Sequence, residues 1–541
     1  MRKNKQLLLI SSAGVLVLLL AAAVDENFRR DWRRIQSEGR GEEGPITVQL
    51  RQVVNPSLRV QDRCVSCHVT MGPGEQSVTG GKILVAHKPV VHDPAEYGCT
   101  VCHGGQGAAT EKDDAHGDVH FWPSPMIPAE ASYAGCGSCH AALSVPNAAR
   151  YREQVAAFER LDCLSCHRVE RRGGTVRPGG GGMEGPDLSR VGLTGYDKDW
   201  HGKHLKKWSA TFAEVSAADQ ELLSGYLATR VAAGPLVEAK SVFHSSGCLG
   251  CHKVSGTGGE EGPDLTRSGE KDPGQLSFAA VQDKHTFANW LGEHFRSPGA
   301  VVAESKMPPV AVEEKDIQKL TLYVLSLRRR DVPGSYLPKD RVRAVRFAER
   351  EFAADGETIF TAFCSGCHGK EGKGRRAPGM AVFPAVGNAD FLSRVSDDFL
   401  RATIKQGRPG RRMAAWDSGS GLRAAEIDAV IAYLRTVSGT VSKAEEQPRF
   451  VSADGRVGER LFAASCSGCH GAKGEGGEGP ALRNAVLLKN ATDGYLVETI
   501  GKGRKGTPMP GFAEASTVHR TYAPGEIESI VAFLRSWEGK K

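Results

Sequence analysis

One pentapeptide, Cys-x-x-Cys-His, recurs seven times in this 541-residue chain and contains all fourteen of its cysteines. The cysteine pairs are Cys64 and Cys67, Cys99 and Cys102, Cys136 and Cys139, Cys163 and Cys166, Cys248 and Cys251, Cys364 and Cys367, and Cys466 and Cys469. The histidines that follow them are His68, His103, His140, His167, His252, His368 and His470. Two thiols at this spacing reach the vinyl groups of one porphyrin, and the adjacent histidine ligates its iron. The sequence therefore predicts seven covalently attached haem c groups and a role in electron transfer.

Other uses of paired cysteines do not fit the pattern. A structural zinc site needs four ligands that converge, whereas here each pair is isolated and its histidine is fused to the second cysteine. A thioredoxin-like redox motif does not require a histidine in every copy. Structural disulfides would not place every cysteine in one repeated pentapeptide.

The bulk composition agrees with a multidomain haem protein. A chain of 541 residues is too long for one hydrophobic core. Its 65 glycines suit small domains in which backbone approaches a porphyrin. The formal net charge of +7 does not indicate nucleic-acid binding, because seven haems would add about −14 from propionates and about +7 from ferric iron. We expect no nucleic-acid partner.

The first 24 residues predict a membrane anchor or an export signal. Residues 7–24 carry no charge, follow three cations, and at eighteen residues are just long enough to span a bilayer. The alanines at 21–23 leave a cleaved signal as the alternative. We favour an uncleaved anchor in the cytoplasmic membrane with the haem domains on the periplasmic side. Phe28, Trp32 and Ile35 recur at helical spacing among arginines, which predicts that this helix continues as an amphipathic arm at the membrane surface.

The spacing of the motifs divides the chain. Four motifs are crowded between residues 64 and 167, whereas each later motif has about a hundred residues to itself. We predict an anchor or signal at 1–24, a multihaem segment at 25–150 with haems 1 to 3, an altered module at 151–235 with haem 4, and single-haem domains at 239–330, 347–440 and 449–541 with haems 5, 6 and 7. The linkers between these domains are 232–235, 331–346 and 438–448.

The three C-terminal segments repeat one plan. A short helical pattern precedes the motif, as at 356–360 and 458–462, and a Gly/Pro-rich loop and a methionine follow it. Closing helices are predicted at 313–328, 423–437 and 524–537, each with apolar residues at helical period. Each closing helix carries one recurring aromatic residue: Tyr323, Tyr433 and Phe533.

These three segments resemble class I cytochrome c domains. The resemblance implies that the first and last helices cross above the haem and that a loop proline packs near the motif histidine, with Pro263, Pro378 and Pro480 in the matching positions. A fourth, altered copy precedes them, closed by a helix at 217–231, but it lacks a Met-Pro segment. The expected fold is mainly α: a membrane helix, a loop-rich multihaem segment, and tandem class I cytochrome c-like domains.

Three methionines are candidates for the sixth iron ligand. Met307, Met413 and Met509 lie 55, 45 and 39 residues after their motif histidines, in the order of the class I ligand loop. A methionine that fills a gap in the core is the alternative for each. No proline follows Met413, and Met380 is its competitor.

The first four haems lack such a loop. Four spare histidines cluster there, namely His87, His92, His116 and His120, and they predict bis-His ligation. His201 and His204 are alternates for haem 4. His244, His285 and His519 are expected to be structural or exposed.

Residues 97–107, with His116 and His120 after them, resemble multihaem cytochromes that accompany bc-type menaquinol-oxidising complexes. That resemblance implies electron relay from a membrane quinol-oxidising complex, such as one containing cytochrome b, to periplasmic acceptors. The rival interpretation is a catalytic multihaem reductase or peroxidase with an open haem in the N-terminal half, because catalysis needs a vacant iron position.

Overall fold

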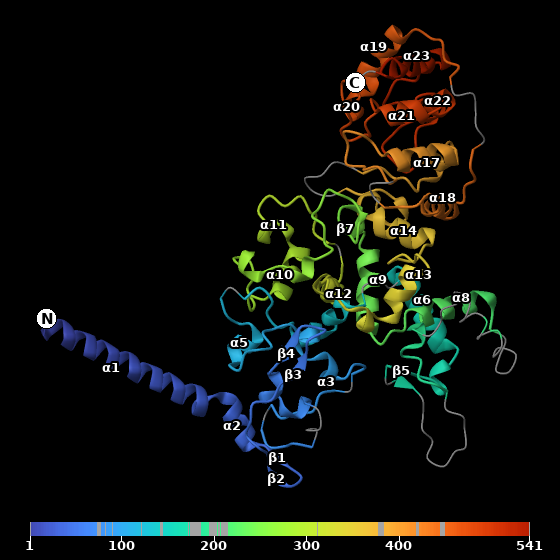
Figure 1. The fold of residues 1–541 in the computed structure, drawn as a ribbon. Coiled ribbons are helices and arrows are strands. Elements are labelled where there is room, and N and C mark those ends of the chain that lie inside the picture. Colours follow the sequence, from blue (N-terminus) through green and yellow to red (C-terminus); the bar gives the residue numbers. More distant parts are fainter. Residues whose placement is uncertain are drawn as a thin grey trace. The chain divides into compact units, whose positions relative to one another are not determined.

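The fold is taken from a computed structural model of the chain (Figure 1). The structure describes residues 2–72, 77–81, 83–88, 90–120, 122–140, 144–170, 172–173, 185–193, 203, 206, 215–310, 312–376, 383–417, 421–443 and 449–539. It is mainly helical, and its strands form four two-stranded antiparallel hairpins. The chain divides into two compact units. The first comprises Met1–Ala141, Arg267–Leu291 and Val324–Pro338, and the second comprises Ala142–Thr266, Gly292–Tyr323 and Lys339–Lys541.

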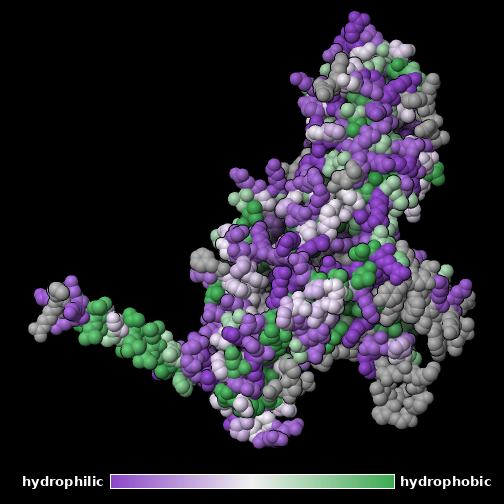
Figure 2. Space-filling model, in the orientation of Figure 1, coloured by the Kyte–Doolittle hydropathy of each residue, from purple (hydrophilic) through white to green (hydrophobic). Residues whose placement is uncertain are grey.

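The N-terminal helix α1 (Arg2–Val24) is largely apolar from Leu7 onward, and its large apolar side chains are exposed. Figure 2 shows it as a mostly hydrophobic (green) stretch with a hydrophilic (purple) N-terminal tip. The helical stretch that includes it is long and apolar enough to cross a membrane, as a signal sequence near an N-terminus also is. The helix does not continue unbroken as predicted: a π-helical turn, η1 (Asp25–Arg29), and an extended residue, Arg30, separate it from α2 (Asp31–Glu38). Trp32 in α2 is buried, so it packs against protein instead of facing a membrane surface.

The first unit contains little regular structure. Its hairpins are β1 (Arg40–Gly41) with β2 (Gly44–Pro45), and β3 (Val53–Asn55) with β4 (Val60–Asp62). Its short helices within Met1–Ala141 are η2 (Cys64–Ser66), η3 (Val69–Met71), α3 (Pro94–Tyr97), α4 (Thr100–His103), α5 (Lys112–His116) and η4 (Ala129–Ser138), and η8 (Ser268–Glu270), η9 (Pro273–Gln275) and η10 (Gly334–Tyr336) lie in its later segments. The described side chains form only small apolar clusters there, such as Leu58, Val60 and Val101. A segment with so little apolar burial requires another source of stability, such as a covalently bound group.

The later helices follow in chain order. They are α6 (Ala148–Arg160), α8 (Ala217–Ala228), α9 (Gly234–Ser245), α10 (Phe287–Arg296), α11 (Pro298–Val301), α12 (Glu314–Ser326), α13 (Lys339–Arg346), α14 (Gly356–Phe363), α15 (Ser365–His368), α16 (Ala389–Leu392), α17 (Asp397–Gln406), α18 (Ala424–Ser438), α19 (Gly455–Ser465), α20 (Ser467–His470), α21 (Ala485–Asn490), α22 (Asp493–Lys502) and α23 (Pro524–Arg535). The remaining hairpins are β5 (Arg168–Val169) with β6 (Arg172–Gly173), and β7 (Lys253–Val254) with β8 (Thr257–Gly258).

Four pairs of helices in the second unit pack through one repeated aromatic contact. The helix before each motif meets the closing helix at Phe158 and Tyr226, at Phe243 and Tyr323, at Phe360 and Tyr433, and at Phe462 and Phe533, with ring centroids 4.6 to 5.5 Å apart. Aromatic pairs at this separation stabilise a contact beyond their area burial. The predicted closing helices are therefore present as α8, α12, α18 and α23, within a few residues of the expected bounds.

Close backbone approach explains the glycines at two of these crossings. A Cβ on Gly356 would lie 2.0 Å from the carbonyl oxygen of Ala429, and one on Gly458 would lie 1.8 Å from that of Ser529. A larger side chain at either position would therefore force the two helices apart.

Part of one predicted linker is helical. The segment 331–346 contains α13, whose Asp340 and Ala344 are buried. A charged sequence can form such a helix when tertiary packing covers one face, because packing outweighs propensity in short helices. Of the predicted linker 232–235, Gly234 and Pro235 begin α9, a position where the missing amide hydrogen of proline costs nothing.

Candidate haem-binding sites

All seven Cys-x-x-Cys-His motifs form the same turn. In each, the amide of the histidine donates to the carbonyl of the first cysteine, at distances between 2.8 and 3.0 Å. The bonds join His68 to Cys64, His103 to Cys99, His140 to Cys136, His167 to Cys163, His252 to Cys248, His368 to Cys364, and His470 to Cys466. A residue and the fourth one after it lie on the same side of a helical turn. Each motif therefore presents its cysteines and histidine as one compact attachment site.

Two of the motif cysteines, Cys248 and Cys364, differ from the cysteines of a redox motif. No disulfide joins any of the fourteen cysteines. Burial raises the pKa of Cys248 and of Cys364 to about 12, which keeps these thiols neutral and opposes the thiolate chemistry of a redox motif. Within the described residues, no three His, Cys, Asp or Glu side chains are grouped so that they could hold a metal ion. The residues fit thioether attachment better than either alternative.

Four motif histidines are oriented by a proline carbonyl. Nδ1 donates to a backbone oxygen at 2.8 to 2.9 Å in the pairs His167 and Pro186, His252 and Pro263, His368 and Pro384, and His470 and Pro480. This bond fixes the tautomer and leaves Nε2 available to a metal, as metal-ligating histidines require. Pro263 and Pro480 were expected in this role. The expected Pro378 lies outside the described residues, and Pro384 makes the contact.

The residue before three of these prolines lies against the imidazole. A Cβ added to Gly185, Gly262 or Gly479 would lie 2.4 to 2.8 Å from a ring carbon of the motif histidine. Glycine therefore lets the chain pass close beside the ring. The sixth motif departs from this pattern, because Phe383 precedes Pro384.

Burial keeps several of these imidazoles neutral. Desolvation lowers the pKa of His68, His103, His252, His368 and His470. A neutral imidazole is the form that ligates a metal. In His68, Nδ1 is also buried and has no hydrogen-bond partner among the described residues.

The three predicted methionines lie in loops of matching geometry. The backbone amide of Arg408 donates to the carbonyl of Met413 at 2.9 Å. In the same way, the backbone amide of Arg504 donates to the carbonyl of Met509 at 3.0 Å. Met413 therefore occupies the position of Met509 although no proline follows it; Met380 lies outside the described residues. The amide of Met307 donates to Ser305 Oγ at 3.3 Å, as that of Met509 does to Thr507 Oγ1.

The structure brings two histidine pairs together in the first unit. The ring centroids of His87 and His103 are 6.1 Å apart, as are those of His92 and His140. Two imidazoles on opposite faces of one metal, each with a nitrogen about 2 Å from it, would place their centroids about 6 Å apart. Both pairs therefore match the separation that bis-His ligation needs.

His116 accompanies the first motif. After burial, the charges of His116 and then of His103 lower the pKa of His68. His201 and His204 lie outside the described residues. His244 is buried and donates from Nδ1 to the carbonyl of Val145 at 3.0 Å, which is a structural role.

Asp62 is a positioning residue that sequence reasoning missed. It is buried beside the first motif and accepts hydrogen bonds from the amides of Cys99 and Thr100 at 2.5 and 2.8 Å. The same carboxylate accepts from the Thr100 hydroxyl at 2.8 Å. It thereby fixes the start of α4, which carries the second motif. Its signal in the sequence is a lone acid two residues before Cys64.

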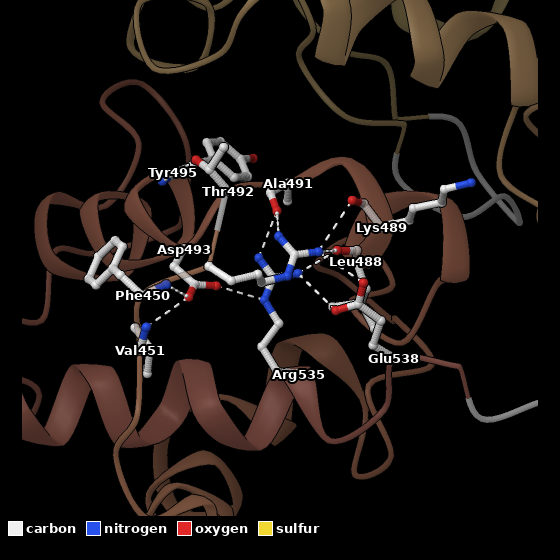
Figure 3. A network of polar contacts seen from close by, with 11 residues as sticks. Phe450, Val451, Leu488, Lys489, Ala491, Thr492, Asp493, Tyr495, Arg535 and Glu538 are labelled. Atoms are coloured by element: carbon white, nitrogen blue, oxygen red, sulfur yellow. Dashed lines mark hydrogen bonds and ion pairs between the residues drawn. The ribbon is translucent and has the colours of Figure 1, made fainter. Parts of the chain in front are cut away.

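A buried ion pair anchors the helix that leads into the last methionine loop (Figure 3). Arg535 in α23 donates from Nε to Asp493 at 2.8 Å, and Asp493 also accepts from the amides of Phe450 and Val451. Asp493 begins α22, which ends next to Gly503 and the loop of Met509. Arg435 and Asp397 make the corresponding pair at 2.9 Å one repeat earlier.

Comparison with known proteins agrees with this geometry. Residues 236–328 match the family model of cytochrome c. Residues 351–434 and 453–534 match the model of cytochrome c oxidase, cbb3-type, subunit III. Each match covers a helix before a motif, the motif itself and most of a closing helix.

Curated relatives are similar over the C-terminal part. The cbb3-type cytochrome c oxidase subunit FixP of Bradyrhizobium diazoefficiens is 29% identical over 35% of this chain and 62% of the relative. FixP of Bradyrhizobium sp. is 30% identical over the same shares, and CcoP of Rhodobacter capsulatus is 28% identical over 34% and 62%. The chain thus spans less than two thirds of the length of these relatives.

Among solved structures, the Kuenenia stuttgartiensis reducing HAO-like protein complex aligns with 34% of this chain and 95% of its own, at 18% identity and a TM-score of 0.24, and no argument rests on it. The repeated helix pairs, the motif turns and the family matches agree with one another. The C-terminal half of the chain carries cytochrome c and cbb3-type cytochrome c domains, which bind haem c covalently and transfer electrons.

Proposed function

We propose that the chain is a heptahaem c-type cytochrome, anchored in the cytoplasmic membrane, that relays electrons from a quinol-oxidising complex to periplasmic acceptors. The observation that carries the proposal is the identical turn of all seven motifs, four of which lie outside the segments matched by family models. A turn that repeats in every copy favours one chemical use for every copy. Haem, when bound, supplies one-electron transfer.

The proposed ligands fall into two classes. His116, His87 and His92 complete the sites of His68, His103 and His140, and His120 is the remaining candidate among the four spare histidines. Met307, Met413 and Met509 complete the sites of His252, His368 and His470. Thioether ligation raises the reduction potential relative to imidazole ligation. Electrons therefore run downhill from the N-terminal segment to the C-terminal domains.

The partners follow from the ends of this relay. The exposed apolar helix α1 supports an N-terminal segment next to a membrane, where a quinol-oxidising complex would donate. The relatives of the C-terminal pair are subunits of cbb3-type cytochrome c oxidase, which supports a membrane oxidoreductase as one partner. We propose that the haem domains lie on the periplasmic side.

Haem stoichiometry and ligand state test the proposal. Intact mass and alkaline pyridine haem quantitation of the fully matured protein should give seven haems and no free thiol. Fewer than seven haems per chain would refute the stoichiometry. A high-spin haem, or carbon monoxide binding to the reduced protein, would favour a catalytic reductase or peroxidase over a relay.

A further inference from the structure

The last two methionine loops contact each other's segments in a reciprocal way. Asn388 precedes α16 and Asn484 precedes α21, and each side-chain oxygen caps its own helix. The amide nitrogen of Asn388 donates to the carbonyl of Lys505 at 2.8 Å, and that of Asn484 donates to the carbonyl of Pro409 at 3.2 Å. Lys505 and Pro409 each lie four residues before the methionine of their loop. The two contacts are therefore the same contact made in both directions.

Equivalent residues also meet at the centre of this contact. Phe399 and Tyr495 occupy corresponding positions in α17 and α22, and their ring centroids are 5.5 Å apart. A local twofold axis produces a self-complementary contact of this kind. On the axis a residue meets its own equivalent, and away from the axis each contact between two different residues occurs once in each direction.

Additional contacts hold the loop of Met509. Arg394 donates to the carbonyl of Gly503 at 2.5 Å, and the amide of Lys505 donates to Asp390 at 2.8 Å. The guanidinium of Arg504 lies 4.7 Å from the centroid of the Phe391 ring. The loop that carries Met509 is thus held in part by the preceding segment.

We propose that Asn388 and Asn484 are reciprocal latches, each of which holds the methionine loop of the other segment closed over its haem. The latch rests on the proposed function, because it assumes that Met413 and Met509 are axial ligands. Each asparagine is a positioning residue and acts through the loop. The two haem domains then form one coupled pair: loss of a latch in one domain weakens methionine ligation in the other.

Replacement of asparagine by aspartate isolates the latch. Asn388→Asp and Asn484→Asp retain an oxygen that caps the helix, but they cannot donate to the opposite carbonyl. Asn490→Asp is the matched control, because Asn490 donates to Val486 within its own helix at 2.8 Å. Each asparagine variant is made in two full-length backgrounds, one that retains only Met413 and one that retains only Met509 as a ligand methionine, the others being replaced by histidine, so that each haem is followed alone.

The experiment measures the binding of imidazole to the ferric protein. The near-infrared band of methionine-ligated iron monitors this binding. Loss of one hydrogen bond should raise the imidazole affinity of the opposite haem about three- to tenfold. Asn388→Asp should act on the haem of Met509, and Asn484→Asp on that of Met413, while Asn490→Asp leaves both unchanged. An effect only within the variant's own segment, or none, would overturn the latch. Absence of the methionine band before any asparagine is changed would overturn the ligand assignment itself.

Discussion

The ion pair of Asp493 and Arg535 offers a direct test of what holds the last domain together. Both oxygens of Asp493 are engaged: Oδ1 by Arg535 at 2.8 Å, and Oδ2 by the amides of Phe450 and Val451 at 2.8 and 2.9 Å. The Asp493 side chain is 2% exposed. Asp493→Asn preserves the shape, removes the charge, and leaves one acceptor oxygen where two are needed.

The expected loss of stability in Asp493→Asn follows from the burial of the ion pair. Removing one partner of a buried ion pair costs about 3–5 kcal/mol. Arg535 keeps hydrogen bonds to the carbonyls of Leu488 and Ala491. Because these bonds partly compensate its charge, we expect a loss near the lower end of that range, at about 3 kcal/mol. That corresponds to about a 150-fold rise in the population of the opened state.

Hydrogen exchange of α22 and α23 in the full-length haem-loaded protein measures this opening. Lys502→Gln is the control, because Lys502 forms an exposed pair with Glu498 four residues earlier, worth about 0.3–0.5 kcal/mol. Lys502→Gln should change the rate of hydrogen exchange in α22 by about twofold. If α22 in Asp493→Asn exchanges at the same rate as in the wild-type protein, this network does not anchor α22.

Three further predictions concern folding, acid stability and potential. Replacing both Cys466 and Cys469 should unfold the last domain, since a domain of about ninety residues has little core without its porphyrin; persistent resistance of 450–541 to proteolysis would contradict this. Burial lowers the pKa of His244 to about 3, so between pH 6.5 and 3 only the unfolded state binds the proton. The free energy of opening α9 should therefore fall by about 1.4 kcal/mol for each unit by which the pH falls in this range. Hydrogen exchange should show no such slope in His244→Leu. Met509→His should lower the potential of one haem in a redox titration and leave reduction of the N-terminal haems intact, and an unchanged titration curve would remove Met509 as a ligand.

Local patterns in the sequence predicted much of the C-terminal half. The motif turns follow from spacing alone, because each is closed by a bond between residues four apart. The closing helices followed from apolar period, and their aromatic residues are the ones that pair across the crossing. The equivalence of Met413 and Met509 was predicted from order along the chain, and the loop geometry supports it.

Contacts between distant residues could not be predicted in the same way. The pairings of His87 with His103 and of His92 with His140 join irregular segments, where no periodicity indicates which ring faces which. Trp32 is buried and Arg30 forms an ion pair with the distant Glu111, and no local pattern indicates either feature. The reciprocal contacts of Asn388 and Asn484 likewise arise only when two repeats meet.

The ligand composition of the oxidised protein tests the central claim most directly. Near-infrared magnetic circular dichroism of the full-length protein distinguishes methionine-ligated from bis-histidine-ligated low-spin haem. The account predicts a methionine band that integrates to three haems and a bis-histidine band that integrates to four. A high-spin haem among the seven, or a methionine band that integrates to fewer than three, would contradict it.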